Sequence, residues 1–254
     1  MWVRRGIAQL AWLVPALVAL ARPGKRGMVL AVLCGLCVFA WFWLVVPRRA
    51  TRAFAAGQLL RARRHYRWLA ASWWPERRDA ARLSLAACAI GLQHDASALL
   101  DQLTTRLATL GLSERAALAN LRALQALQTG RHDAALDFAD AACALRPDVP
   151  ELAHTRALCL IALDRTDEAI ALLELATAEP DHTRHEAERC AALAVAWLRK
   201  GEREYAHDYR RRAFQFWSEI PAPSPALSPA PSPAPSPTPS PTPSIDEHDA
   251  APSA

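Results

Sequence analysis

The sequence predicts an all-α protein. It is expected to form a solenoid of helical hairpins, preceded by one or two transmembrane helices and followed by a disordered proline-rich tail. Three observations lead to this prediction. The chain of 254 residues is 52% hydrophobic and rich in alanine, leucine and arginine, a composition that favours helix over strand. A pattern of small residues recurs every 34 residues, and two apolar runs, at residues 6–21 and 28–46, open the chain.

The two apolar runs predict a membrane anchor over residues 1–49. At 1.5 Å per residue the run 28–46 reaches about 28 Å, enough to cross the hydrocarbon core of a bilayer. Aromatic and cationic residues gather at its end, as is typical of a membrane–water interface. The candidate interface residues are Trp41, Trp43, Arg48 and Arg49. The run 6–21 is shorter, and a second membrane helix or a cleavable signal peptide would account for it.

Arginines predict which side of the membrane the rest of the chain occupies. Several follow the second run closely, and the positive-inside rule then places the solenoid in the cytoplasm. Three cations in the loop between the two runs, Arg22, Lys25 and Arg26, favour the opposite orientation. The cytoplasmic location is the one we expect.

The 34-residue period is clearest in the middle of the chain. It relates Ala123 to Ala157 and Ala135 to Ala169, at positions where the two helices of each hairpin are expected to cross closely. Gly130 is expected to supply the left-handed residue that ends a first helix, and a proline closes each copy. Because one hairpin cannot bury its apolar face alone, neighbouring hairpins must stack.

These residues make the sequence resemble the tetratricopeptide repeat (TPR) family. The resemblance implies TPR-like repeats over residues 111–220 and degenerate hairpins over residues 50–110, where Gly57 is interpreted as a small crossing residue. In layout the chain is similar to bacterial inner-membrane TPR proteins of haem and cytochrome c assembly, which implies a bacterial inner-membrane location. The loop between the apolar runs has only about six residues, however, and is too short for the long loop of those assembly factors.

The resemblance also implies a function. TPR proteins are non-catalytic scaffolds that hold a protein or peptide in a concave groove lined by the first helices of successive hairpins. By the 34-residue register Asn120 and His154 occupy equivalent inward positions, and Gln128 and Arg199 follow one or two turns later. We predict these four as partner-binding residues. No catalytic residue is predicted, because the sequence has no glycine-rich phosphate loop and no nucleophile motif.

Two clusters leave an alternative open, an envelope or cofactor (haem, metal or redox) assembly factor. Cys34 and Cys37 have redox spacing, but they lie in an apolar run with no charged group to lower a thiol pKa. A second group could place zinc ligands along one helix face, although a polar helix start is also expected at this repeat junction. It comprises His182, His185, Glu186 and Cys190. No metal site and no cofactor is therefore predicted.

The charge distribution argues against nucleic-acid binding. Residues 1–52 contain eight arginines and lysines and no acid, while the whole chain has a net charge of +5. The basic character therefore belongs mainly to the membrane flanks. Residues 221–254 are predicted to be a disordered tail, and the 11 prolines of residues 221–244 favour extended polyproline II. Such a tail would serve as a solvated spacer or as a ligand for a proline-binding module.

Overall fold

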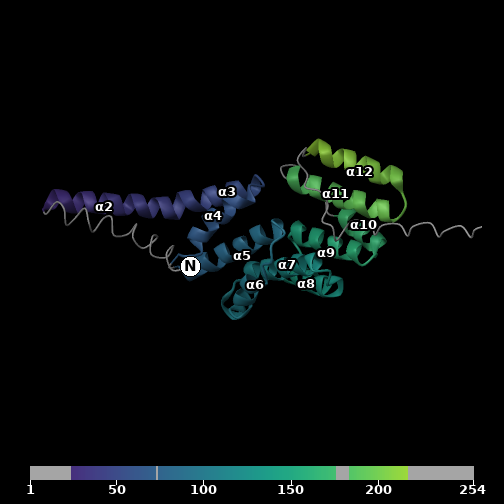
Figure 1. Ribbon diagram of the computed structural model, residues 1–254, viewed down its shortest axis with the longest axis horizontal. Coiled ribbons are helices and arrows are strands. Elements are labelled where there is room, and N and C mark those ends of the chain that lie inside the picture. The colour runs from purple at the N-terminus through teal and green to yellow at the C-terminus, as the bar shows by residue number, and fades with distance from the viewer. Residues whose placement is uncertain (1–23, 73, 176–182, 217–254) are drawn as a thin grey trace, which may run out of the picture.

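The computed structural model describes residues 24–72, 74–175 and 183–216, and every regular element in these ranges is helical (Figure 1). The predicted all-α class is confirmed. The apolar run 6–21 and the proline-rich tail lie outside the described residues. The chain begins with α2 (Lys25–Ala40), the π-helical turn η1 (Trp41–Val45) and α3 (Val46–Ala55). The remaining elements are α4 (Leu59–Leu69), α5 (Pro75–Gly91), α6 (Ser97–Thr104), the 3₁₀ turn η2 (Leu107–Thr109), α7 (Leu112–Gln128), α8 (His132–Leu145), α9 (Pro150–Ala162), α10 (Thr166–Leu175), α11 (Thr183–Arg199) and α12 (Arg203–Phe216).

From α3 onward the helices pair into hairpins: α3 with α4, α5 with α6, α7 with α8, α9 with α10 and α11 with α12. The first helices α5, α7, α9 and α11 also pack on one another in order, so they form one layer of the solenoid. Figure 1 shows the stack passing from the long N-terminal helix through α7 to α12. The predicted hairpin solenoid is therefore confirmed, and its first hairpin begins within the helix that carries the apolar run.

A residue with positive φ closes every one of these hairpins. In the third hairpin Gly130 has φ 73°, and two backbone hydrogen bonds close the turn, from Gly130 to Leu127 (3.1 Å) and from Arg131 to Ala126 (2.9 Å). The same pair of bonds recurs at each turn. The five turn residues are Gly57, Gln93, Gly130, Asp164 and Gly201. The interpretation of Gly57 as a crossing residue is therefore wrong, because Gly57 lies in the first turn.

Alanines lie at fixed offsets from these turn residues, where the paired helices approach each other. Seven residues before the turn, the alanines of the first four hairpins are fully buried; they are Ala50, Ala86, Ala123 and Ala157. Five residues after the turn, three hairpins again have a fully buried alanine: Ala62, Ala135 and Ala169. The second hairpin departs from this pattern, since its Ala98 is exposed. A methyl group is thus the largest side chain that most of these crossings accept.

The turn residues lead to a prediction for Gln93, which adopts φ 57° without being glycine. The left-handed region costs a non-glycine residue about 1–2 kcal/mol, and a glycine at this position would avoid that cost. Part of this gain is lost, because glycine loses more conformational entropy on folding. We expect Gln93→Gly to raise the free energy of unfolding by about 0.5–1 kcal/mol. Chemical denaturation followed by circular dichroism measures the change. The reverse variant, Gly130→Ala, should be destabilising, and a shift of the same sign in both variants would contradict the argument.

The apolar helix and the solenoid are joined without a linker. Elements α2, η1 and α3 form one continuous helix, so the predicted boundary at residue 49 falls inside it. Pro47 has no N–H to donate to the carbonyl of Trp43 four residues earlier, and the helix widens there into a π-helical turn. Arg77 at the start of α5 donates from Nη1 to this carbonyl oxygen at 3.3 Å. Its guanidinium also stacks 3.2 Å from the centre of the Trp43 ring, and Trp74 meets the same ring edge-on at 5.3 Å.

Candidate functional site

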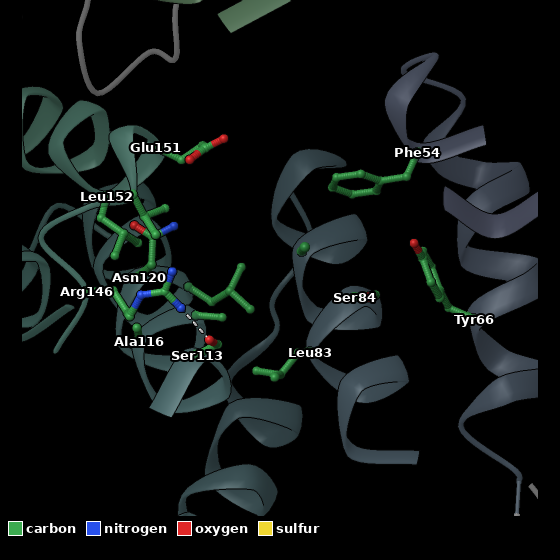
Figure 2. Close-up of a pocket in the computed structure, with 14 residues that line it drawn as sticks. Phe54, Tyr66, Leu83, Ser84, Ser113, Ala116, Asn120, Arg146, Glu151 and Leu152 are labelled. Carbon is green, nitrogen blue, oxygen red and sulfur yellow. Dashed lines mark hydrogen bonds between the residues drawn. The ribbon is translucent and has the colours of Figure 1, made fainter. Parts of the chain in front are cut away.

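A groove of about 410 Å³ opens among the first helices of the solenoid. Figure 2 shows Phe54 and Tyr66 of the first hairpin on one side, Asn120 of α7 and Leu152 of α9 on the other, and α5 between them. Four hairpins contribute to it, because the stacking of α5, α7 and α9 brings their inward faces together. The groove therefore lies on the surface where the sequence predicts a partner.

The groove is mainly apolar, with a few polar atoms that could orient a ligand. The rings of Phe54 and Tyr66 meet edge to face, with centroids 6.4 Å apart. Burial raises the pKa of the Tyr66 phenol, so the group stays protonated at neutral pH. The side-chain oxygen of Asn120 is buried and has no hydrogen-bond partner among the described residues. An unpaired buried acceptor is unfavourable, and a donor from a bound peptide would satisfy it.

Arg146 lies at the rim of this groove, in the loop between α8 and α9. Its Nη1 donates to the Ser113 hydroxyl at 2.5 Å, and its Nε and Nη2 donate to the two carboxylate oxygens of Asp148 at 2.8 and 2.7 Å. The hydrogen bonds from Arg146 lower the pKa of Asp148 to about 2. The guanidinium is thereby oriented at the groove edge while part of it remains open to solvent.

Of the four predicted partner-binding residues, Asn120 lines the groove. His154 is its equivalent one repeat later, and it is not among the residues that line this groove. It lies on α9, and burial lowers the pKa of its imidazole, so the ring is neutral at pH 7. A role of either residue in partner binding stays a prediction.

Gln128 and Arg199 occupy equivalent positions, each two residues before a turn residue. The amide Nε2 of Gln128 donates to the carbonyl oxygen of Ile90 at 2.7 Å, and Nη1 of Arg199 donates to the carbonyl oxygen of Ile161. In both cases the acceptor lies three residues before the turn residue of the preceding hairpin. These side chains therefore tie neighbouring first helices together at two junctions of the solenoid. That Gln128 and Arg199 also contact a partner stays a prediction.

Sequence reasoning missed Gln125, which is only 6% exposed. Its Oε1 accepts a hydrogen bond from the backbone N–H of Ala96 at 3.0 Å, and so holds the start of α6 against α7. A signal was present, because Leu118, Leu121 and Gln125 share one face of the helix. A glutamine in an apolar stripe indicates a buried polar contact.

The predicted interface residues lie where the apolar run ends. Trp41 is 47% exposed, and the guanidinium of Arg49 lies 4.8 Å from the centre of its ring. Trp43 instead contacts Arg77 and Trp74, as described above, and Arg48 is exposed. Within the described ranges, the helix Gly27–Ala55 is the one long and apolar enough to cross a membrane, judged by length and composition. Only 11% of its most apolar window is buried.

The described residues that could support a redox or metal site do not gather into one, and some of them have other partners. Cys34 is partly exposed and Cys37 exposed on α2, both as free thiols. His185 pairs through Nε2 with Oε1 of Glu151 at 3.2 Å, while burial raises the pKa of Cys190 to about 11. His182 lies outside the described residues. In the part of the chain that the structure describes, no group of three or more histidine, cysteine or acidic side chains is arranged to hold a metal ion.

Comparison with known families gives residues 126–189 a match to the model described as a tetratricopeptide repeat. The chain contains tetratricopeptide repeats. The matched segment runs from the end of α7 into α11. TPR domains in general bind protein or peptide partners, so this is the fold of a protein-interaction scaffold.

Two solved structures of the TPR protein MamA are similar to this chain. One, titled MamA MSR-1 C2, is 16% identical to this chain, with a TM-score of 0.40; the alignment covers 67% of this chain and 94% of the MamA chain. The other, titled as a crystal structure of MamA protein, is 19% identical and covers 71% and 94%, also with a TM-score of 0.40. No curated protein matches the sequence significantly.

Proposed function

We propose that this protein is a membrane-anchored, non-catalytic TPR scaffold that holds an extended segment of a partner protein in the groove beside α5. The observation that supports it best is the groove itself, which is mainly apolar and carries an unpaired buried acceptor at Asn120. A peptide main chain has regularly spaced N–H groups and side chains, so it matches such a surface. His154, Gln128 and Arg199 would extend the contact along the first helices.

The apolar helix supports the anchoring part of the proposal. A core helix of a soluble protein is mostly buried, whereas the apolar window in Gly27–Ala55 is 11% buried. Its exposed leucine, valine and aromatic side chains would be stabilised by lipid. We place the anchor at residues 1–49 and the solenoid on the cytoplasmic side of a bacterial inner membrane. The partners are proteins and the lipid bilayer, with no role for nucleic acid and no cofactor.

Site-specific photo-crosslinking in native membranes tests the scaffold. A photoreactive residue replaces Ala117, which lines the groove, or Ala171, which is exposed on α10 in the second-helix layer. We expect adducts of defined mass at position 117 only. Ala87 of α5 also lines the groove, so Ala87→Trp should fill it and suppress these adducts. Equal adducts at both positions, or adducts that persist in the filled variant, would contradict the proposal. Extraction of the same membranes with alkaline carbonate tests the anchor separately, since an integral protein stays in the pellet.

A further inference from the structure

The proline-rich segment, residues 221–244, is the part of the sequence that the proposed function does not use. From Pro229 to Ser244 every second residue is proline, and the residues between are alanine, serine or threonine. Such a sequence favours the extended polyproline II conformation, which costs little entropy to fix on binding. Segments of this kind bind in grooves lined by aromatic side chains. The segment lies outside the described residues, but a groove with this kind of lining lies within them.

The groove beside α5 suits a chain with small side chains. Its lining includes three alanines from two first helices, Ala87 of α5 and Ala116 and Ala117 of α7. On the opposite side Phe54 is half-buried, and the ring of Tyr66 holds it edge to face, so a proline can pack against it. No residue from 229 to 244 has a side chain larger than that of proline or threonine. The segment can therefore lie along this lining without a bulky group to accommodate.

Asn120 adds a polar requirement that this segment meets. Its buried side-chain oxygen has no hydrogen-bond partner among the described residues and needs a donor. Proline has no N–H, but each residue between the prolines has one, and serine and threonine add a hydroxyl. Polyproline II has three residues per turn, so every turn of the alternating sequence contains at least one donor. An uninterrupted run of prolines would leave this oxygen unpaired.

The segment also leaves the solenoid at the end where the groove opens. Arg146, just before α9, donates to Ser113 at the start of α7 at 2.5 Å. His185 at the start of α11 pairs with Glu151 at the start of α9 at 3.2 Å. The starts of α7, α9 and α11 therefore lie side by side. Helix α12 packs along α11 after the turn at Gly201, so the end of α12 returns to the level of these starts (Figure 1).

The length of chain after α12 is sufficient to reach the groove. Packed helices lie about 8–10 Å apart, so two such steps place α7 about 20 Å from α11. Only four residues separate the end of α12 from Pro221. The 24 residues of the segment then extend about 74 Å at 3.1 Å per residue. About six residues in this conformation span the distance from α5 to α9, so a quarter of the segment fills the groove.

We propose that the proline-rich segment of the same chain occupies the groove beside α5 when no partner is bound, and that one of its non-proline residues donates to the side-chain oxygen of Asn120. The proposal rests on the proposed function, because it assigns a built-in competitor to the same groove. A tethered ligand has an effective concentration on the order of millimolar, so a weak contact is enough to keep the groove occupied. A partner must displace the segment before it binds.

Photo-crosslinking in the purified full chain tests whether the segment occupies the groove. A photoreactive residue replaces Ala117 in the groove or the exposed Ala171 on α10, and mass spectrometry identifies the joined peptides. We expect about tenfold or more cross-linking to residues 221–244 from position 117 than from position 171. Helix α10 packs on α11 and is closer than α7 to the point where the segment begins. A segment without a preferred site would therefore react at least as well at position 171, and that result would overturn the proposal.

Two changes within the segment leave the helices untouched. A photoreactive residue at Ala234 should react with α5 and α7, and reaction mainly with other helices would contradict the proposal. Replacing the eight prolines from Pro229 to Pro243 with glycine keeps the length of the segment but removes its preference for polyproline II. Because the glycine chain must be ordered on binding, we expect cross-linking from position 117 to fall about tenfold. An unchanged yield would mean that the groove does not recognise the segment.

An equal mixture of unlabelled and isotope-labelled protein tests whether the contact lies within one chain. Cross-links that join a labelled to an unlabelled peptide would overturn the proposal in favour of a second copy. In native membranes, deletion of residues 221–254 should raise the partner adducts at position 117 about threefold or more, since the groove is then free. The cross-links to the segment need no partner. Their absence beside normal partner adducts would reject this proposal alone, and the reverse result would reject the proposed function alone.

Discussion

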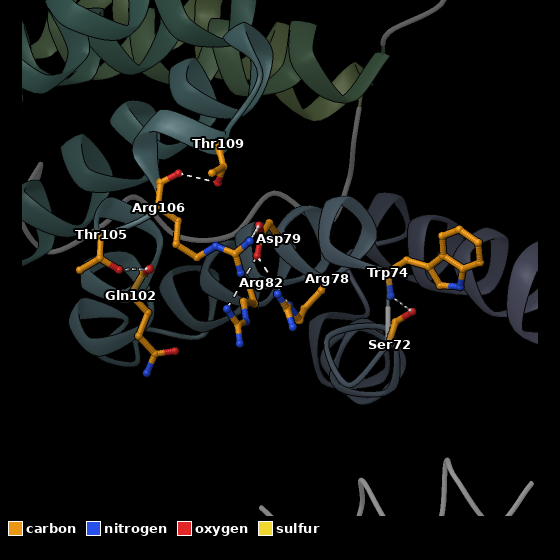
Figure 3. A network of polar contacts seen from close by, with 9 residues as sticks. All are labelled: Ser72, Trp74, Arg78, Asp79, Arg82, Gln102, Thr105, Arg106 and Thr109. Atoms are coloured by element: carbon orange, nitrogen blue, oxygen red, sulfur yellow. Dashed lines mark hydrogen bonds and ion pairs between the residues drawn. The ribbon is translucent and has the colours of Figure 1, made fainter.

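Replacing Asp79 with alanine is expected to lower the free energy of unfolding by about 2–3 kcal/mol, because Arg78, Arg82 and Arg106 all lie within 4.0 Å of its carboxylate (Figure 3) and would lose this counter-charge. The carboxylate is 5% exposed and forms an ion pair with Arg106, whose Nη2 lies 3.0 Å from Oδ2. This pair joins the start of α5 to the segment after α6. Removing one member of a buried ion pair leaves the other uncompensated, and full burial would give a larger loss. The partial exposure of the arginines moderates it. Chemical denaturation of the full chain measures the effect.

Asp101→Ala is the matched control for this prediction. Asp101 also pairs with an arginine across two helices, at 3.2 Å from Arg122, but its side chain is 74% exposed. Surface pairs contribute about 0–1 kcal/mol, so the control should lie close to the wild type. A loss at Asp79 no larger than the loss at Asp101 would mean that water, rather than the carboxylate, compensates Arg78, Arg82 and Arg106.

Replacing Ala157 with leucine is expected to destabilise the fourth hairpin by about 2–3 kcal/mol, since three extra carbon atoms must enter a close-packed crossing. Ala157 is fully buried and packs in one cluster with Leu160, Ala169 and Leu193. The larger side chain would push α9 away from α10 and α11. We expect an earlier unfolding transition by circular dichroism and faster proteolysis around α10.

Ala171→Leu provides the comparison, because Ala171 is exposed on the adjacent helix α10. Leucine and alanine have similar helix propensity, so this variant should unfold like the wild type. If Ala157→Leu also unfolded like the wild type, the crossing would be loose enough to accept a leucine. The fixed spacing of buried alanines would then have no steric origin.

The last three hairpins could be predicted from the sequence in some detail, and the first two only in outline. In the third hairpin Gly130, Ala123 and Ala135 all follow one register, and each is a residue type that the turn or the crossing requires. In the second hairpin the turn residue is Gln93, which carries no signal for a left-handed conformation. Ala50 and Ala86 are crossing residues as well, but an alanine-rich chain offers many candidates for that role.

Only one part of the groove, around Asn120, could be located from the sequence. The 34-residue register led to Asn120, which lines it, because the register identifies the inward face of a first helix. Phe54 and Tyr66 could not be predicted, since they reach the groove through the stacking of different hairpins. The contact of Arg77 with Trp43 spans 34 residues and depends on a carbonyl that a proline leaves without its helical donor. The predicted membrane sidedness and the roles of His154, Gln128 and Arg199 stay predictions.

The uninterrupted helix from α2 into α3 has a consequence for partner choice. Helix α3 has 10 residues, about 15 Å, and Phe54 near its end lines the groove. With α2 in a bilayer, the groove stands at a set height above the headgroups, since no flexible linker lets it move toward or away from them. A partner anchored in the same membrane would meet this groove at a high effective concentration if its own tether spans that height. The protein would thus select its partners by the distance of their binding segment from the membrane surface as well as by its sequence. A solenoid free in solution cannot make this selection.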